Sequence, residues 1–330
     1  MKKILGILAL AAAGGLAACD GNSLLPAAPV ADPADPVVDP VADPNDGGIG
    51  GDPDLPPGTA SPTPDDGIFR VEEGGDAQTF FYDSSTDEFT VDNLPFDAVG
   101  PQPPGATGDR YVRVTAAPAI GTLDPDGIPG NRRIAVYQNA DGLNAYKLVY
   151  GTSASGDTSF AIVRSSSYLD YGPGGFIYER NNDVVIPDGG TANYDGEYAG
   201  VRIFDNDGGI ELTEGLIAIE VDFEDFNVGG AIQGFMTNRV AYDPEDATSF
   251  IALNDLILNT GEFSSAGEFG GTANSYDGAS NDVVESGQYF GLLSGADAGE
   301  MVGMIVITSE NEGPAGGSIQ ETGGFLATTP

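Results

Sequence analysis

Short runs of alternating apolar and polar residues fill the chain from about residue 68 to its end. In the clearest run, four apolar side chains alternate with a mostly acidic set: Ile217, Ile219, Val221 and Phe223 against Ala218, Glu220, Asp222 and Glu224. Alternation with a period of two predicts a strand with one face in the core and one in solvent. Because no segment of helical length carries an apolar stripe, the sequence predicts an all-β protein.

Turns rich in glycine, proline and aspartate divide these runs into two groups. The first group opens with a predicted hairpin, whose strands at 79–82 and 88–91 flank a polar turn. Further strands are predicted at 110–115, 133–138, 145–150, 159–165 and 175–179. The turn at residues 187–190 ends the group, so residues 68–189 are predicted to form a β-rich domain.

The second group contains eight strand candidates in succession, at 192–204, 210–223, 228–238, 249–259, 261–273, 285–294, 300–308 and 317–328. Eight strands joined by short polar turns favour an up-and-down barrel, because closure removes exposed strand edges. In a small barrel, glycines inside strands relieve tight bends and crowding. Seven occur here: Gly196, Gly200, Gly229, Gly234, Gly267, Gly287 and Gly291. Residues 190–330 are therefore predicted to form an eight-stranded β-barrel.

The first nineteen residues have the order of an export signal. Lys2 and Lys3 precede a short apolar run and a series of small residues, which end at Cys19, the only cysteine of the chain. The run is shorter than the roughly 20 residues that span a bilayer. The tetrapeptide Leu16-Ala17-Ala18-Cys19 resembles a bacterial lipobox, in which the cysteine is acylated. An ordinary secretory signal with an incidental thiol is the alternative.

We therefore predict that residues 1–18 are a lipoprotein signal peptide and that Cys19 is the lipid attachment site. Several acyl chains on one residue anchor a protein stably, so we expect a membrane-anchored lipoprotein of the bacterial envelope. The outer membrane or cell surface is the expected location. Asp20 resembles an inner-membrane retention signal of some enteric bacteria, which leaves the choice of membrane open.

Residues 19–67 are predicted to be a disordered stem rich in proline and aspartate. The run Pro-Val-Ala-Asp-Pro occurs at 29–33 and again at 40–44, and aromatic residues are absent. Such a segment cannot bury a core and favours polyproline II, with a reach of at most on the order of 150 Å. A spacer is the preferred interpretation, and a proline-motif ligand for a partner is the alternative.

Composition excludes several function classes. The 330 residues include 51 acidic and 12 basic ones, and the formal charge of −39 repels nucleic acid. Without histidine there is no Ser-His-Asp triad and no imidazole metal ligand. One cysteine allows no internal disulfide, thiolate zinc site or iron–sulfur cluster. We expect no enzyme activity, no cofactor and no metal, and we interpret the charge as a means of solubility.

Acidic residues supply the first candidate sites. Glu220, Asp222 and Glu224 share one face of a strand, and a hydrolase can use such carboxylates, but we expect that face to be a solvated outer wall. The Asp-Gly clusters at 124–127 and 205–208 could hold calcium. Neither has the spacing of an EF-hand, and aspartate and glycine are typical of turns.

Basic and aromatic residues supply two more candidate sites. The adjacent pair Arg132-Arg133 could contact an anionic ligand or simply neutralise nearby aspartates. Four aromatic residues, Tyr168, Tyr171, Phe176 and Tyr178, flank a glycine turn. Aromatic residues favour interfaces, but core packing is the preferred interpretation here.

Glycine and aromatic motifs of the C-terminal region resemble those of transferrin-binding protein B-like β-barrel lipoproteins. Residues 194–200 resemble the opening strand of those barrels, and residues 229–234 an inner strand. Residues 286–291, continued by 298–303, are similar to the family's Gly-x-aromatic-aromatic-Gly hairpin. Residues 261–263 and 267–272 also fit, whereas 294–296 lack the proline usual in the family.

The resemblance covers about residues 190–330 and implies one handle-plus-barrel lobe, with residues 68–189 as the handle-like domain. It also implies a surface-exposed lipoprotein that binds a protein or an iron- or haem-carrying partner. Binding residues of the family lie in variable loops, so none is assigned.

The leading hypothesis is thus a non-enzymatic, membrane-anchored lipoprotein that binds a partner protein or small ligand outside the cytoplasmic membrane. A structural or adhesive envelope lipoprotein is the alternative, and a carboxylate-based hydrolase is the third class. A packed barrel would indicate recognition by loops, and an open one a small apolar ligand.

Overall fold

The computed structural model describes residues 50–51, 69–73, 77, 79–83, 86–92, 94, 109–114, 134–140, 146–165, 171–181, 183–205, 207–224, 231–310, 313 and 317–330. These residues confirm the all-β prediction: they form two nine-stranded sheets and one 3-10 turn, η1 (Ala296–Ala298). Both sheets belong to one compact unit, Val41–Pro330. In the described part of the chain, no helix is long and apolar enough to cross a membrane. The predicted signal peptide and Cys19 lie outside the described residues.

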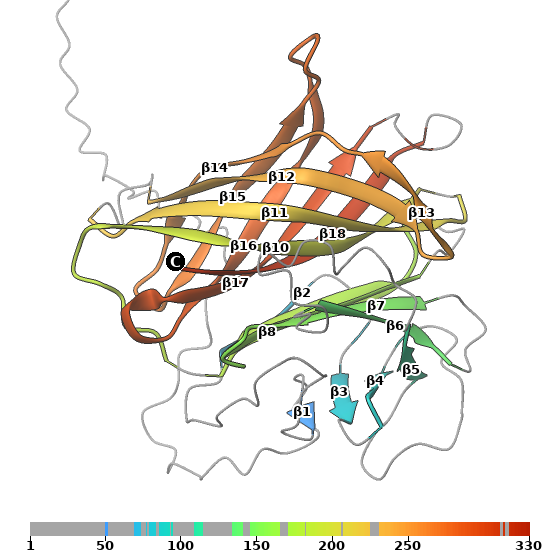
Figure 1. Cartoon of the computed structure of the whole chain (residues 1–330), viewed down its shortest axis with the longest axis horizontal. Helices are drawn as coiled ribbons and strands as arrows, with labels where there is room; N and C mark the ends of the chain where they lie inside the picture. Colours follow the sequence, from blue (N-terminus) through green and yellow to red (C-terminus); the bar gives the residue numbers. More distant parts are fainter. Residues whose placement is uncertain are drawn as a thin grey trace, which may run out of the picture. The chain divides into compact units, whose positions relative to one another are not determined.

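The first sheet has the strand order β1-β3-β4-β5-β6-β7-β8-β9-β2 (Figure 1). Its strands are β1 (Gly50–Gly51), β2 (Phe69–Glu73), β3 (Thr79–Asp83), β4 (Glu88–Asp92), β5 (Asp109–Arg113), β6 (Ile134–Asn139), β7 (Tyr146–Thr152), β8 (Thr158–Ser165) and β9 (Gly174–Arg180). Strands β3 to β9 lie where alternation predicts them. The pattern missed β2, which pairs with β9, and β1, a short parallel partner of β3 inside the predicted stem.

This sheet buries side chains on both faces. Along β6, Ile134 and Val136 belong to one apolar cluster, and Ala135 and Tyr137 to another. The second cluster is rich in aromatic residues: Phe80, Tyr82, Phe89, Tyr111, Tyr137, Tyr146 and Tyr150. The first cluster also contains residues of the second sheet, so the two sheets share a core.

The second sheet closes into a barrel of eight strands in chain order, with β13 as an additional strand on β12 (Figure 1). Its strands are β10 (Thr191–Phe204), β11 (Ile210–Asp222), β12 (Ile232–Asp243), β13 (Asp246–Ala252), β14 (Leu256–Phe263), β15 (Glu268–Tyr276), β16 (Val283–Ser294), β17 (Glu300–Ser309) and β18 (Ile319–Thr328). Pairing of β18 with β10 closes the ring. The predicted eight-stranded up-and-down barrel is therefore confirmed.

The sequence misplaced one turn of this barrel. We expected strands at 249–259 and 261–273, whereas the chain continues as β14 to Phe263 and turns at 264–267. The Ser264 hydroxyl accepts hydrogen bonds from the N–H groups of Ala266 and Glu268, both at 3.2 Å. Gly267 adopts a φ of 78°, which favours glycine. The turn is thus determined by local hydrogen bonds that alternation does not reveal.

Side chains fill the barrel interior. One apolar cluster draws residues from all eight barrel strands, including Tyr194, Tyr198, Phe269, Tyr289 and Phe325. The ring of Tyr198 lies so close to Gly323 that a Cβ there would approach its Cζ to 2.1 Å. Glycine therefore gives the space that the aromatic ring occupies, as expected for a crowded small barrel.

Aromatic side chains of the first sheet pack on the outer wall of the barrel. Phe176 and Tyr178 on β9 contact Phe290 on β16, with ring centroids 5.8 and 5.7 Å apart. Both are buried, which agrees with the core-packing interpretation of this aromatic group. Tyr171 is half-buried, and Tyr168 lies outside the described residues.

Candidate functional site

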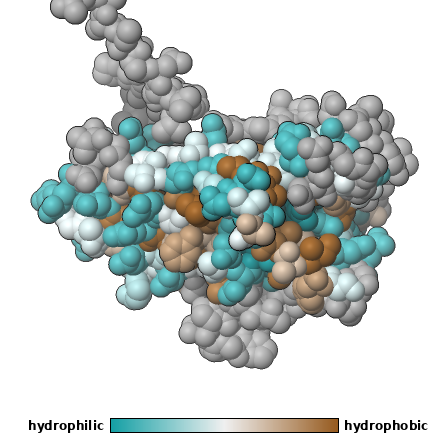
Figure 2. All heavy atoms as spheres, turned by 90° about the horizontal axis from the view of Figure 1, so that it is seen from above, coloured by the Kyte–Doolittle hydropathy of each residue, from teal (hydrophilic) through white to brown (hydrophobic). Residues whose placement is uncertain are grey.

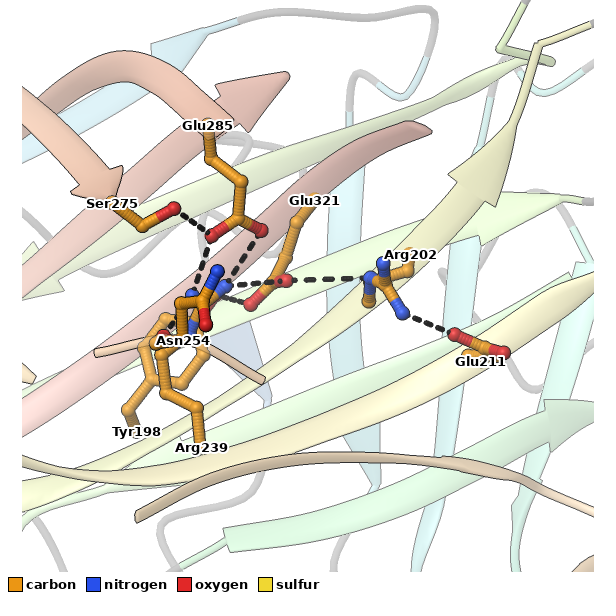
Figure 3. A network of polar contacts seen from close by, with 8 residues as sticks. All are labelled: Tyr198, Arg202, Glu211, Arg239, Asn254, Ser275, Glu285 and Glu321. Carbon is orange, nitrogen blue, oxygen red and sulfur yellow. Dashed lines mark hydrogen bonds and ion pairs between the residues drawn. The ribbon is translucent and has the colours of Figure 1, made fainter. Parts of the chain in front are cut away.

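A buried ionic cluster crosses the barrel interior near one end. The guanidinium of Arg239 on β12 donates to Glu285 on β16, from Nη1 to Oε2 at 2.7 Å and from Nη2 to Oε1 at 3.2 Å. It also donates from Nη2 to Oε2 of Glu321 on β18, at 2.9 Å (Figure 3). These three strands are not neighbours around the barrel. One arginine therefore links opposite parts of the wall.

A bulge in β12 turns Arg239 inward. Met236 and Arg239 are both buried, while Thr237 is half-buried and Asn238 is exposed. Asn238 adopts a φ of 54°, and the pairing with β11 shifts register at this place. Two consecutive outward residues reverse the alternation that follows. Without the bulge, the arginine would point to the outer wall.

Further polar groups complete the cluster. Tyr198 donates to Oε1 of Glu321 at 2.7 Å, and Ser275 donates to Oε2 of Glu285 at 2.6 Å. The carbonyl of Asn254 accepts a bond of 2.7 Å from Arg239 Nη1. Arg202 pairs with Glu211 at 2.5 Å and approaches Glu321 at 3.6 Å (Figure 3). Hydrogen bonds thus compensate charges that burial would otherwise penalise.

Burial and pairing oppose each other in the pKa values of this cluster. Desolvation lowers the pKa of Arg239, but the charge of Glu321 and the hydrogen bonds to Glu285 outweigh it and raise the pKa overall. Desolvation likewise favours a protonated Glu285, yet Arg239 and Ser275 hold its pKa below the usual range. Burial, followed by the charge of Glu321, raises the pKa of Tyr198. Arg239 and Glu285 are therefore charged, and Tyr198 neutral, at neutral pH.

The mouth of the barrel lies against this cluster. A pocket of about 240 Å³ is lined by Arg202, Glu211 and Glu285, which are charged, and by apolar residues: Phe204, Ile251, Leu253, Val284 and Ile319. Exposed apolar side chains occur beside it, because Ile251 is 55% and Val283 is 55% accessible. Phe250, the neighbour of Ile251 on β13, is 51% accessible. The mouth is thus a shallow pocket with a charged side and an apolar rim.

A second hollow lies on the outer wall, over β10, β11, β12 and β14, with a volume of about 610 Å³. Phe235 and Ile257 lie opposite each other on paired strands and are both exposed. Asp195 and Glu220 also line it. Figure 2 shows hydrophobic side chains gathered in patches among hydrophilic ones on the face that it presents. The described residues of the barrel thus form a hollow at its mouth and another on its wall.

The predicted carboxylate candidates lie on this outer wall. Glu220 and Glu224 are exposed and Asp222 is half-buried, opposite the buried Val221 and Phe223. Asp222 accepts a hydrogen bond of 2.9 Å from the N–H of Glu224, as in a turn. The solvated outer wall expected from the sequence is confirmed, and the arrangement has no shielded carboxylate pair.

Other candidates fall in different places. Arg132, Arg133 and the cluster at 124–127 lie outside the described residues. Asp207 belongs to a turn, since its N–H donates to the carbonyl of Phe204, whereas the N–H of Asp205 donates to the carbonyl of Ser318. Among the residues that the structure describes, no group of three acidic, histidine or cysteine side chains could hold a metal ion.

Sequence reasoning missed the charged cluster itself. Glu321 lies two and four residues before Gly323 and Phe325, so alternation from the buried phenylalanine could have placed it inside. Arg239 carried no such signal, because the bulge at Asn238 inverts the pattern.

Comparison with known proteins gives a partial likeness. No protein-family model and no curated protein sequence matches the chain. Among solved structures, a double mutant of transferrin-binding protein B from Haemophilus parasuis is 10% identical, over 79% of this chain and 44% of its own, with a TM-score of 0.39. The isotype 1 protein from serogroup B Neisseria meningitidis is 13% identical, over 59% of this chain and 35% of its own, with a TM-score of 0.33.

The chain spans less than half the length of these two proteins. At such TM-scores and identities the likeness carries no conclusion about function, and membership of the family stays a prediction.

Proposed function

We propose that the protein is a non-enzymatic, lipid-anchored binding protein that recognises a partner protein outside the cytoplasmic membrane. The filled barrel is the observation that carries this proposal. Tyr198, Phe269 and Tyr289 occupy the interior, and the Arg239 cluster lies across one end. A small apolar ligand inside the barrel would need an open interior. Recognition is therefore assigned to the surface, where exposed apolar residues surround the mouth.

The rim residues have the properties of interface anchors. Phe250 and Ile251 expose about half of their surface next to a charged pocket. Apolar residues that are central in an interface, with polar groups around them, contribute most of its binding energy. Replacement of Ile251 by serine should therefore weaken partner capture, whereas Phe235→Ser on the outer wall should leave it unchanged.

A capture experiment tests the binding proposal. The folded chain without its lipid is immobilised and exposed to the extracellular medium and envelope extract of its own bacterium, and bound proteins are compared between the wild type and the two serine variants. A protein retained by the wild type and by Phe235→Ser, but lost with Ile251→Ser, supports the proposal. If no protein shows that pattern, the mouth is not the binding surface.

The nature of the partner follows the resemblance of the sequence to transferrin-binding protein B-like lipoproteins. An iron- or haem-carrying protein is the proposed class. Binding of haem and of iron-loaded transferrin is measured by titration at micromolar concentration. Absence of binding, together with normal growth of a deletion strain under iron limitation, would exclude this class.

The anchor rests on the sequence around Cys19, and the barrel strands follow the predicted stem along the chain. Cys19→Ser should abolish labelling by a fatty acid and release the protein in soluble form. Retention of the variant on the membrane would show that the anchor is assigned to the wrong residue. The same variant provides the soluble chain for the capture experiment.

A further inference from the structure

Strand β13 has an open edge. Among the described residues it pairs with β12 alone, while the earlier part of β12 pairs with β14 on the same side. Figure 1 shows β13 beside the end of β12. The barrel wall is thus continued at its mouth by a strand with a neighbour on one side.

The alternation of hydrogen-bonded and non-hydrogen-bonded pairs between β12 and β13 shows which backbone groups face this edge. The N–H of Leu253 donates to the carbonyl of Arg239 at 2.9 Å, which makes these two residues a hydrogen-bonded pair. Such pairs alternate along an antiparallel ladder, so Ile251 and Ala241 form the next one. The N–H and C=O groups of Phe250 and Ala252 therefore point away from β12, toward the open edge.

Side chains on both faces of β13 are accessible. Phe250 lies near Tyr242 on one face, with ring centroids 5.7 Å apart, and Ile251 lines the mouth on the other. Ser249 and Ala252 are exposed as well. Proteins commonly protect an edge strand with lysine, proline or a covering segment. The sequence of β13, DATSFIA, contains neither lysine nor proline.

Acidic residues surround this edge and indicate the charge of its partner. Asp243 ends β12, Glu245 lies in the turn before β13 and Asp255 follows it, and all three are exposed. A second copy of this chain would bring a further formal charge of −39 to the contact. A partner with lysine or arginine would instead be attracted.

We infer that β13 binds an extended partner segment in which apolar residues alternate with lysine or arginine. The segment pairs with the outward groups of Phe250 and Ala252 and adds a strand to the barrel wall, as in β-strand addition. Its apolar side chains contact Phe250 or Ile251, and its basic side chains meet the surrounding carboxylates. This inference rests on the proposed binding function and names the partner's chemistry.

A designed peptide tests the inference. The probe is a fluorescent eight-residue peptide in which valine alternates with lysine and arginine, and its Kd for the soluble Cys19→Ser chain is measured at physiological salt. The matched control peptide has N-methyl groups on alternate residues, which keeps the charge and removes half of the backbone donors. Strand addition predicts that methylation weakens binding at least about tenfold, which corresponds to about 1.4 kcal/mol.

Two protein variants and one control locate the site. Ala252→Pro removes an outward N–H without removing a bond to β12, and Phe250→Lys places a positive charge on the edge. Each substitution should raise the Kd of the unmethylated peptide about tenfold. Ile257→Lys is the control, because Ile257 is exposed on a strand that is paired on both sides. Circular dichroism and unfolding midpoints verify that each variant is folded.

Amide hydrogen exchange provides a readout that charge alone does not change. Bound peptide should slow exchange at Phe250 and Ala252. Equal affinity of the methylated peptide, or unchanged exchange at these amides, overturns the inference. If a native partner is still captured by Ala252→Pro and Phe250→Lys, the binding function stands and the edge is excluded. If neither peptide nor native partner binds, the binding function itself is wrong.

Discussion

Arg239 and Glu285 form a two-pronged ion pair inside the barrel, with Nη1 to Oε2 at 2.7 Å and Nη2 to Oε1 at 3.2 Å. Arg239 is 1% accessible, and its second acidic partner, Glu321, is 2% accessible. Removal of one member from a buried ionic group leaves the others without compensation. The stability of the barrel is therefore sensitive to a change of charge at any member of this cluster.

Arg239→Met should destabilise the protein by about 3–5 kcal/mol, because Glu285 and Glu321 would remain buried without their shared cation. The free energy of unfolding in urea measures the effect. The matched control replaces all three residues, as Arg239→Met, Glu285→Leu and Glu321→Leu. An apolar group of similar volume needs no charge compensation, so this triple variant should recover much of the loss. A triple variant as unstable as Arg239→Met would contradict the prediction.

The pKa of Glu285 predicts an acid-sensitive component of stability. Its pKa is lower in the folded protein than the ordinary value of 4.5. The stabilisation that its ionised form provides is complete above about pH 4.5 and disappears as the pH falls through the folded pKa. The difference in unfolding free energy between wild type and Glu285→Gln should therefore be largest at neutral pH and shrink in acid. Unfolding curves between pH 3 and 7, about the range of carboxylate titration, measure it.

An exposed carboxylate provides the control for this pH dependence. Glu224 lies on the solvated outer wall. Glu224→Gln makes the same replacement at an exposed position, and it should leave the free energy of unfolding at neutral pH within about 0.5 kcal/mol of the wild type. If the difference in unfolding free energy between wild type and Glu285→Gln were the same at every pH, the effect of this substitution would come from packing and not from charge.

Alternation along the chain predicted most strands and one important face. Ile217, Ile219 and Val221 are buried, and Glu220 is exposed, as the period of two requires. This pattern is informative because a barrel strand has one face in solvent and one face in the core. It missed β2, which pairs only with β9 among the described residues, a strand distant in the sequence.

The candidate site could be predicted less well, for two physical reasons. First, Arg239 faces inward because a single residue, Asn238, adopts a positive φ and shifts the phase of β12. Second, the residues 249–259, expected as one strand, are interrupted between β13 and β14, which creates the open edge. A bulge and a break depend on pairing with distant strands, and such pairing is not visible in local patterns.

The bulge predicts a specific tolerance at position 238. Asn238 has a φ of 54°, a conformation that costs most residues about 1–2 kcal/mol and glycine little. Asn238→Gly should leave the unfolding midpoint in urea nearly unchanged, whereas Asn238→Val should destabilise the protein by about 1–2 kcal/mol. Asn274→Val is the control, since Asn274 lies in regular pairing with β14 and β16. Equal tolerance of valine at both positions would argue against a strained bulge.

Phe160 joins the two sheets through a contact that only glycine permits. A Cβ at Gly324 on β18 would lie 2.3 Å from Cδ2 of Phe160, and one at Gly151 on β7 would lie 2.4 Å from its Cε1. The ring thus fills the space between the two glycines and cannot retreat from either. Gly324→Ala should therefore destabilise the protein by about 1–3 kcal/mol, as overpacking of a core does.

A double-mutant cycle separates this clash from other effects of the substitution. Phe160→Leu removes the ring edge that the new methyl group would meet, so the double variant should be more stable than the sum of the single effects by about 0.5–3 kcal/mol. Gly278→Ala is the matched control, because a Cβ at this exposed turn meets no atom within 4 Å. It should change stability by less than about 0.5 kcal/mol. Additive effects of Gly324→Ala and Phe160→Leu would mean that the ring does not pack on β18.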